Sequence, residues 1–117
     1  MIQKIYIAGK VTGLTPEEYH KNFDDARTIV YTYYPYAEII LPSELCDDDW
    51  SWERSMEVCI DTLWGCDAIV MMENWKDSHG AIIERKLAQK LGIPIMELEN
   101  NKIKNHKDEF QRDYSSY

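Results

Sequence analysis

The sequence has few features of membrane, nucleic-acid-binding or secreted proteins. No apolar run approaches the length of about 18 residues that a membrane-spanning helix needs. The first residues, Met1 to Lys4, lead directly into a strand-like pattern and do not resemble a signal peptide. There are 13 Lys and Arg residues against 21 Asp and Glu, which gives a net charge of -8. We therefore expect no nucleic-acid partner and no membrane partner, because both need a basic face or an apolar span.

Cysteine is also scarce. Cys46, Cys59 and Cys66 are odd in number and lie in or beside apolar segments, which predicts free thiols in a reducing compartment and a cytoplasmic protein. No His or Cys pair has the spacing of metal ligands. The run Asp47–Asp49 lacks the Gly and the distal Glu of a calcium loop, so we interpret it as a solvated acidic turn in which one Asp caps the next helix. We expect neither a metal nor a cofactor.

The residues that are present favour one α/β domain. Apolar residues make up 44% of the chain and charged residues 29%, as in globular proteins. The patterns predict strands over 4–8, 37–41, 67–72 and 93–98, and helices over about 16–33, 50–64 and 78–91. This alternation predicts a three-layer, doubly wound parallel sheet with right-handed crossovers. The domain would span residues 1–98, and a polar C-terminal tail would span residues 99–117.

One helix places a carboxylate on its inward face. Ser78 is a good N-cap, and Gly92 ends the helical pattern. Residues three and four apart share a helix face, so the neighbours of Glu84 are small or apolar: Gly80, Ala81, Leu87 and Ala88. A carboxylate on such a face tends to have a raised pKa or a specific partner, which makes Glu84 a functional candidate. The alternative is a half-exposed Glu at the edge of the apolar stripe.

Two loops should converge near Glu84. Gly9–Gly13 follows the first strand and Glu73–Gly80 follows the third, and ligands of parallel sheets bind beyond the carboxyl ends of the strands. Open backbone amides and a helix N-terminus favour a phosphate or carboxylate group. Trp75 and Tyr6 are candidates for an aromatic surface against a planar base. Both are equally candidates for the core, and core packing is the stronger interpretation for Tyr6.

Several segments together resemble the nucleoside 2-deoxyribosyltransferase superfamily, over about residues 4–98. They are Ile5-Tyr6-Ile7-Ala8-Gly9, Cys66-Asp67-Ala68-Ile69, Trp75, Ser78-His79-Gly80-Ala81, Glu84 and Leu91-Gly92-Ile93-Pro94. The sequence is most similar to a small branch of uncharacterised domains found in phages and prophages. The resemblance implies a flavodoxin-like fold, a homo-oligomer, and cleavage of the N-glycosidic bond of a deoxynucleoside or its 5′-monophosphate. Transferases of the superfamily pass the sugar to another base, and the related hydrolases pass it to water.

The resemblance also implies roles for individual residues. Glu84 matches the nucleophilic glutamate, and Ser78 matches the serine that the nucleotide hydrolases use on the 5′-phosphate. The loop from Gly9 to Gly13 resembles their phosphate-side loop, with Lys10 as a cationic helper. Tyr6 matches an aromatic residue of the sugar site. The remaining predicted substrate-binding residues are Asp67, Trp75, His79 and Gly80, although Asp67 is more often a structural acceptor of loop amides in such a position.

The sequence departs from the active families at one position. They carry an Asp on the second helix, eight residues before the Asp that opens the third strand, and this Asp helps to protonate the leaving base. Here that position is Cys59, and Asp61 lies on another face of the helix. Cys59 is interpreted as a small core residue. The departure leaves an alternative function open, a binding module that holds a nucleotide without chemistry.

Overall fold

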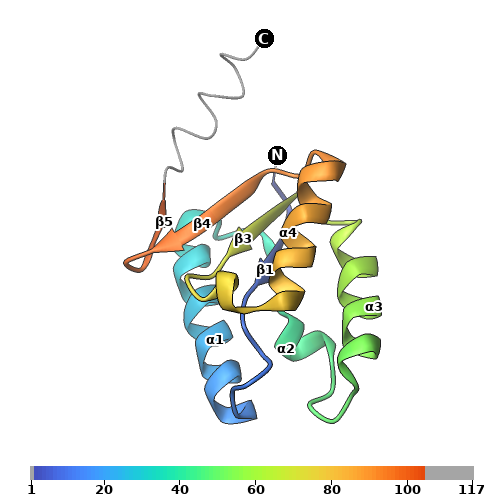
Figure 1. Cartoon of the computed structure of the whole chain (residues 1–117). Helices are drawn as coiled ribbons and strands as arrows, with labels where there is room; N and C mark the ends of the chain where they lie inside the picture. The colour runs from blue at the N-terminus through green and yellow to red at the C-terminus, as the bar shows by residue number, and fades with distance from the viewer. Residues whose placement is uncertain (1, 105–117) are drawn as a thin grey trace.

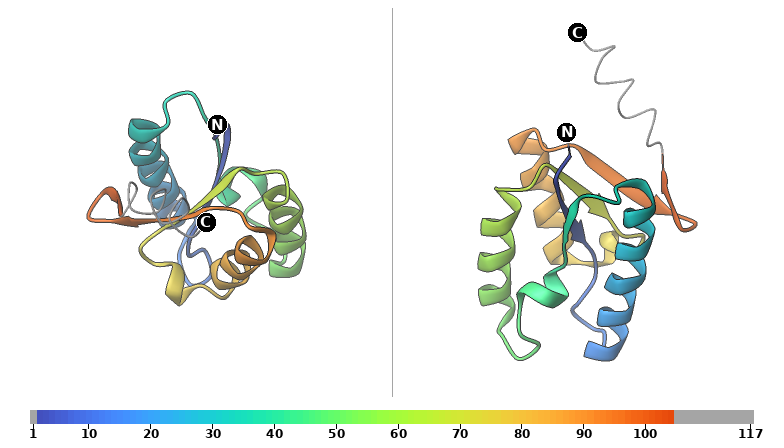
Figure 2. Two further views of the ribbon diagram at one scale, coloured as in Figure 1. Left: turned by 90° about the horizontal axis from the view of Figure 1, so that it is seen from above. Right: turned by 180° about the vertical axis from the view of Figure 1, so that it is seen from behind.

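The computed structural model describes residues 2–104 and shows a three-layer α/β fold (Figures 1 and 2). A five-stranded sheet has the order β2-β1-β3-β4-β5, in which β1 to β4 are parallel and β5 is antiparallel to β4. The strands are β1 (Lys4–Ala8), β2 (Glu38–Ile40), β3 (Ala68–Met71), β4 (Ile95–Glu99) and β5 (Lys102–Lys104). The helices are α1 (Pro16–Tyr33), α2 (Pro42–Leu45), α3 (Trp52–Leu63), the 3-10 helix η1 (Trp75–Asp77) and α4 (His79–Leu91). This is the predicted flavodoxin-like, doubly wound arrangement.

The two central strands separate two apolar clusters. Ile5 and Ile7 of β1 pack with the inward face of α1, whereas Tyr6 and Ala8 pack with α3 and α4 on the other face. The same division holds along β3, because successive side chains of a strand point to opposite faces. Figure 2 shows α1 on one side of the sheet and α3 with α4 on the other. The continuously apolar sequence of these strands reflects burial on both faces.

The boundaries of α1 and α4 lie at residues that cap helices well. Thr15 caps α1 in a reciprocal capping box with Glu18. The Ser78 hydroxyl accepts a hydrogen bond from the Ala81 amide and so caps α4. The last helix ends at Gly92, whose φ of 72° is a left-handed conformation that glycine adopts without strain. These local signals explain why α1 and α4 begin and end where the sequence predicted.

Three details of the second half of the predicted pattern were wrong. The segment after β2 is not all loop, because Pro42 starts the short helix α2. Ser51 caps α3 through the Arg54 amide, and none of Asp47–Asp49 does so. Trp64, the last residue of the predicted helix over 50–64, lies after α3 and is 62% exposed. The helix ends at Leu63, and the next side chain lies about 100° further around the axis.

The sheet also extends beyond the predicted boundary at residue 98. Asn100 and Asn101 both have positive φ and connect β4 to β5 as a two-residue hairpin turn. Ile103 of β5 is buried, and its amide donates to the hydroxyl of Tyr33 at 3.1 Å. The folded unit therefore reaches residue 104, while Phe110 of the predicted tail lies outside the described residues. Between residues 2 and 104, no helix is long and apolar enough to cross a membrane.

Candidate active site

Glu84 is a buried carboxylate on the inward face of α4, as predicted. Its side chain is 4% exposed and accepts a hydrogen bond from the hydroxyl of Tyr6, which β1 presents from the middle of the sheet. Burial raises the pKa of Glu84 to about 7, and the bond from Tyr6 opposes this rise. The pKa of Tyr6 is raised as well, first by burial and then by the charge of Glu84. Glu84 therefore changes its charge near neutral pH.

Cys59 is the third member of this buried group. It lies on α3, is 4% exposed, and has the Tyr6 hydroxyl as a hydrogen-bond partner. Burial raises the pKa of the Cys59 thiol, and the carboxylate of Glu84 raises it further. The side chain is thus a neutral thiol at physiological pH. This confirms the interpretation of Cys59 as a small buried residue and leaves the group with one carboxylate.

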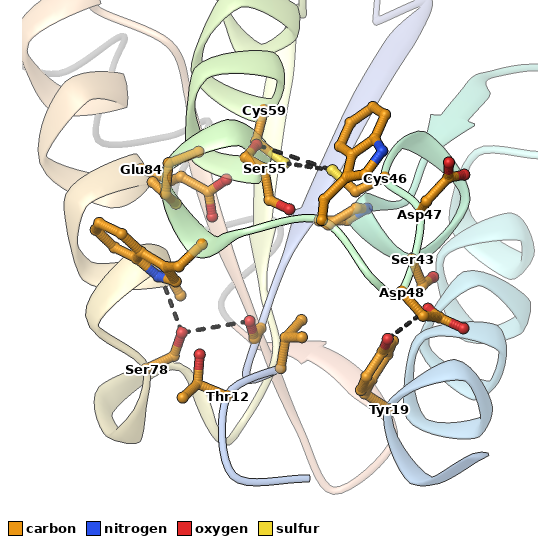
Figure 3. A pocket seen from close by; sticks show the side chains of 18 residues that line it. Thr12, Tyr19, Ser43, Cys46, Asp47, Asp48, Ser55, Cys59, Ser78 and Glu84 are labelled. Carbon is orange, nitrogen blue, oxygen red and sulfur yellow. Dashed lines mark hydrogen bonds between the residues drawn. The ribbon is translucent and has the colours of Figure 1, made fainter. Parts of the chain in front are cut away.

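A cavity of about 190 Å³ opens beside this group (Figure 3). It lies beyond the carboxyl ends of the first three strands, where the strand order reverses between β1 and β3. Its wall is formed by the loop after β1, by α2 and the following loop, by α3, and by the first turns of α4. Residues that contribute to it include Val11, Thr12, Tyr19, Ser43, Trp50, Trp52, Ser78, Gly80 and Glu84. The cavity is the place where a ligand can reach Glu84.

The two glycine-containing loops converge as predicted. The hydroxyl of Ser78 donates to the carbonyl oxygen of Gly9 at 3.4 Å. The backbone amide of Lys10 donates to Asn74 Oδ1 at 3.0 Å. A Cβ on Gly9 would lie 2.4 Å from the sulfur of Met72, so a glycine is needed here for close packing of the loop against the chain after β3. These contacts fix one wall of the cavity.

Glycine at position 80 serves helix packing. A Cβ there would lie 2.9 Å from the sulfur of Met56. The first turn of α4 can therefore approach α3 closely, which brings Glu84 near Cys59. Gly80 also lines the cavity, together with Gly9 and Ser78.

The other predicted substrate-binding residues lie outside the cavity wall. Asp67 precedes β3, at the opposite end of the strand from the cavity, and accepts 2.9 Å hydrogen bonds from the amides of Gln3 and Lys4. Its position supports the structural role and not a ligand contact. Trp75 is half-buried against the apolar cluster that contains Tyr6, and the guanidinium of Arg85 lies 4.8 Å from its ring centroid. The remaining three are the exposed His79, the half-buried Lys10 and the exposed Gly13.

The sequence did not reveal the residues that α2 and the following loop contribute. Asp48 accepts hydrogen bonds from the Tyr19 hydroxyl and, at 2.9 Å, from His20, which together attach this loop to α1. The bond from Tyr19 is the larger cause that lowers the pKa of Asp48. Ser43 is buried, and its hydroxyl has no partner among the described residues. The rule that ligands bind at the carboxyl ends of strands, applied to β2, would have pointed to this segment.

The ionisation of Glu84 predicts a pH-dependent stability difference. The folded-state pKa lies above the ordinary glutamate value of 4.5, so the folded protein holds a proton that the unfolded chain releases. The stability that this bound proton contributes is lost as the pH rises toward about 7. The pKa difference between the folded and the unfolded state corresponds to roughly 3 kcal/mol in the free energy of unfolding. Glu84→Gln should therefore gain stability relative to the wild type between about pH 5 and about pH 8.

Urea unfolding of both proteins at these two pH values measures the difference. Glu57→Gln changes an exposed carboxylate on α3 and should show no such gain. A Glu84→Gln effect of equal size at both pH values would contradict a raised pKa.

A family model described as "Domain of unknown function (DUF4406)" matches residues 3–97. No curated protein matches the chain. The matched span contains every residue that lines the cavity, including Glu84 and Cys59, and it also contains Tyr6.

Proposed function

Because the chain belongs to the DUF4406 family, whose description states no function, we propose a function from the site itself. The protein cleaves or transfers the N-glycosidic bond of a nucleoside or nucleotide, with the carboxylate of Glu84 as the nucleophile. The observation that carries this proposal is a buried carboxylate that lines a cavity and has a pKa of about 7. The resemblance to the nucleoside 2-deoxyribosyltransferase superfamily supports the same reaction.

The proposed reaction has two steps. A carboxylate oxygen of Glu84 forms a bond to C1′ of the sugar while the bond from C1′ to the base nitrogen breaks, and the base leaves with the electron pair and acquires a proton. Water or a second base then attacks C1′ and releases the carboxylate. Dividing one displacement into two lowers the barrier, and negative charge near C1′ stabilises the oxocarbenium-like transition state.

Tyr6 is proposed to position the nucleophile. Its hydroxyl donates to Glu84 Oε2. This hydrogen bond favours the ionised form of the carboxylate, against the effect of burial, so that a substantial fraction is ionised near neutral pH. The bond also fixes one carboxylate oxygen of a residue that lines the cavity.

The charges of the cavity favour an uncharged nucleoside over its 5′-monophosphate. Asp47, Asp48 and Glu84 all line the cavity, and none of its described lining residues is Lys, Arg or His. The Ser78 hydroxyl is already engaged with Gly9 and Ala81. The N-terminus of α4 attracts an anion, but no described cation of the cavity lining supports it.

The experiment is free-base release from a panel of deoxynucleosides and their 5′-monophosphates. We expect a higher kcat/KM for the nucleosides by at least about tenfold, because a phosphate would face carboxylates without a cationic partner. A preference for the monophosphates would contradict the inference that the charges of the cavity disfavour a phosphate. Absence of release from every compound would contradict the proposed reaction.

Cys59 favours a second candidate function. A thiol that stays protonated cannot supply the proton that a carboxylic acid of ordinary pKa supplies to a leaving base. The same cavity would then hold a nucleoside or nucleotide without cleaving it. Thermal stabilisation by a nucleoside without base release would support this candidate. The cytoplasmic location, the homo-oligomer and the absence of a nucleic-acid partner stay predictions from the sequence.

A further inference from the structure

Two thiols meet in the wall of the cavity. Cys46 is the C-cap residue directly after α2, and Cys59 lies within α3. Their sulfur atoms are 3.7 Å apart, and both residues line the cavity beside Glu84 (Figure 3). The proposed glycosidic chemistry uses neither sulfur atom.

We propose that Cys46 and Cys59 form an oxidisable dithiol site, which a hydroperoxide that enters the cavity converts into a disulfide. A disulfide requires the sulfur atoms to approach to about 2.05 Å. Cys46 follows a helix of only four residues and precedes the loop to α3, so it does not lie within a long regular element. A small displacement of this segment brings the sulfur atoms to bonding distance.

The environments of the two thiols define the order of events. Cys46 is half-buried and accessible from the cavity, whereas Cys59 is buried against Tyr6 and Glu84. Burial and the Glu84 carboxylate raise the pKa of Cys59, so its thiol stays protonated. Because Cys46 is the more accessible of the two, it is the first to react with peroxide, and Cys59 is the resolving thiol.

The two steps balance as follows for hydrogen peroxide. The Cys46 thiolate attacks one peroxide oxygen, the O–O bond breaks, and the hydroxide that leaves takes up the proton that Cys46 lost, which gives a sulfenic acid and water. The Cys59 sulfur then attacks the Cys46 sulfur, the S–O bond breaks, and a second water leaves with the proton of Cys59. Two thiols lose two electrons in total, and the peroxide is reduced by two electrons.

The disulfide would change the site that Cys59 now contacts. Its formation draws the Cys59 sulfur toward Cys46 and away from Tyr6 and Glu84. It also ties α3 to the start of the loop that carries Asp47 and Asp48, both of which line the cavity. The oxidised protein should consequently have a more rigid cavity wall and a higher melting temperature.

The third cysteine provides a matched control. Cys66 is buried outside the cavity wall, and its thiol donates to the carbonyl oxygen of Thr62 at 3.4 Å. Its distance from the cavity predicts that it stays reduced while the other two are oxidised. Cys66→Ser should therefore leave the reaction intact, and Cys46→Ser should prevent it.

The test treats the full-length protein with hydrogen peroxide and blocks the remaining thiols with an alkylating reagent. Peptide mass spectrometry should find one bond between Cys46 and Cys59, and the number of free thiols should fall from three to one. Dithiothreitol should restore all three. Oxidation should raise the melting temperature of the wild type and of Cys66→Ser by several degrees, and not that of Cys46→Ser.

Three results would overturn the proposal. They are a bond that includes Cys66, a disulfide between two chains, and oxidation of Cys46 to a sulfinic acid without any bond to Cys59. The peptide map of the wild type decides among these outcomes even if a cysteine variant fails to fold.

Discussion

Glu84→Gln is expected to lower the rate of base release by about 10³-fold or more. The amide of glutamine is a poor nucleophile toward C1′ and cannot balance the positive charge that develops on the sugar. The substitution keeps the size of the side chain and an oxygen that accepts the hydrogen bond from Tyr6. The loss should therefore appear in kcat, while the dissociation constant of the substrate changes little.

The measurement is initial-rate base release under saturating nucleoside, with Glu57→Gln as the matched control. Glu57 is an exposed acid on α3 and does not line the cavity. The control should retain the wild-type rate. If Glu84→Gln also retained that rate, the carboxylate would not be the nucleophile, and the cavity would require another mechanism.

Cys59→Asp is expected to increase base release by about 100-fold, because a carboxylic acid can protonate the leaving base where the wild-type thiol does not. The position is suited to this role, since Cys59 lines the cavity and is a hydrogen-bond partner of Tyr6. The new carboxyl group would lie near Glu84 in a buried site. One of two such groups holds a proton near neutral pH, because both cannot be charged at low cost.

The gain in rate should be accompanied by a loss of stability. A buried polar side chain with incomplete hydrogen bonding lowers the free energy of unfolding by about 1–3 kcal/mol, which urea unfolding can measure. Cys59→Asn has nearly the same shape as the aspartate variant but no acidic proton. Equal rates for Cys59→Asp and Cys59→Asn would contradict a general-acid role at this position.

Much of the fold was predictable because its signals are local. Thr15, Ser78 and Gly92 determine helix ends through contacts within a few residues. The continuously apolar sequences of β1 and β3 indicate central strands that are buried on both faces. The hairpin to β5 was missed because one buried residue, Ile103, and an Asn-Asn turn make a weak pattern in a polar segment.

The site was predictable where one helix or one strand end determined it. The spacing around Glu84 indicated its inward face, and the ends of β1 and β3 indicated two converging loops. The opposite wall depends on tertiary contacts between distant segments. Asp48 accepts a hydrogen bond from Tyr19, and the sulfur of Cys46 contacts that of Cys59. The hydrophobic periodicity of the sequence does not predict either contact. Asp67 was included in the predicted site through the family resemblance, although it lies at the end of β3 that is opposite to the cavity.

The central claim is that the Glu84 carboxylate forms a covalent bond to the sugar, and the most direct measurement is peptide mapping of the wild type quenched during turnover of a deoxynucleoside. The account predicts a 2-deoxyribosyl ester on the peptide that contains Glu84, and no ester in Glu84→Gln. Base release without any adduct on that peptide would contradict the claim and would indicate direct attack by water.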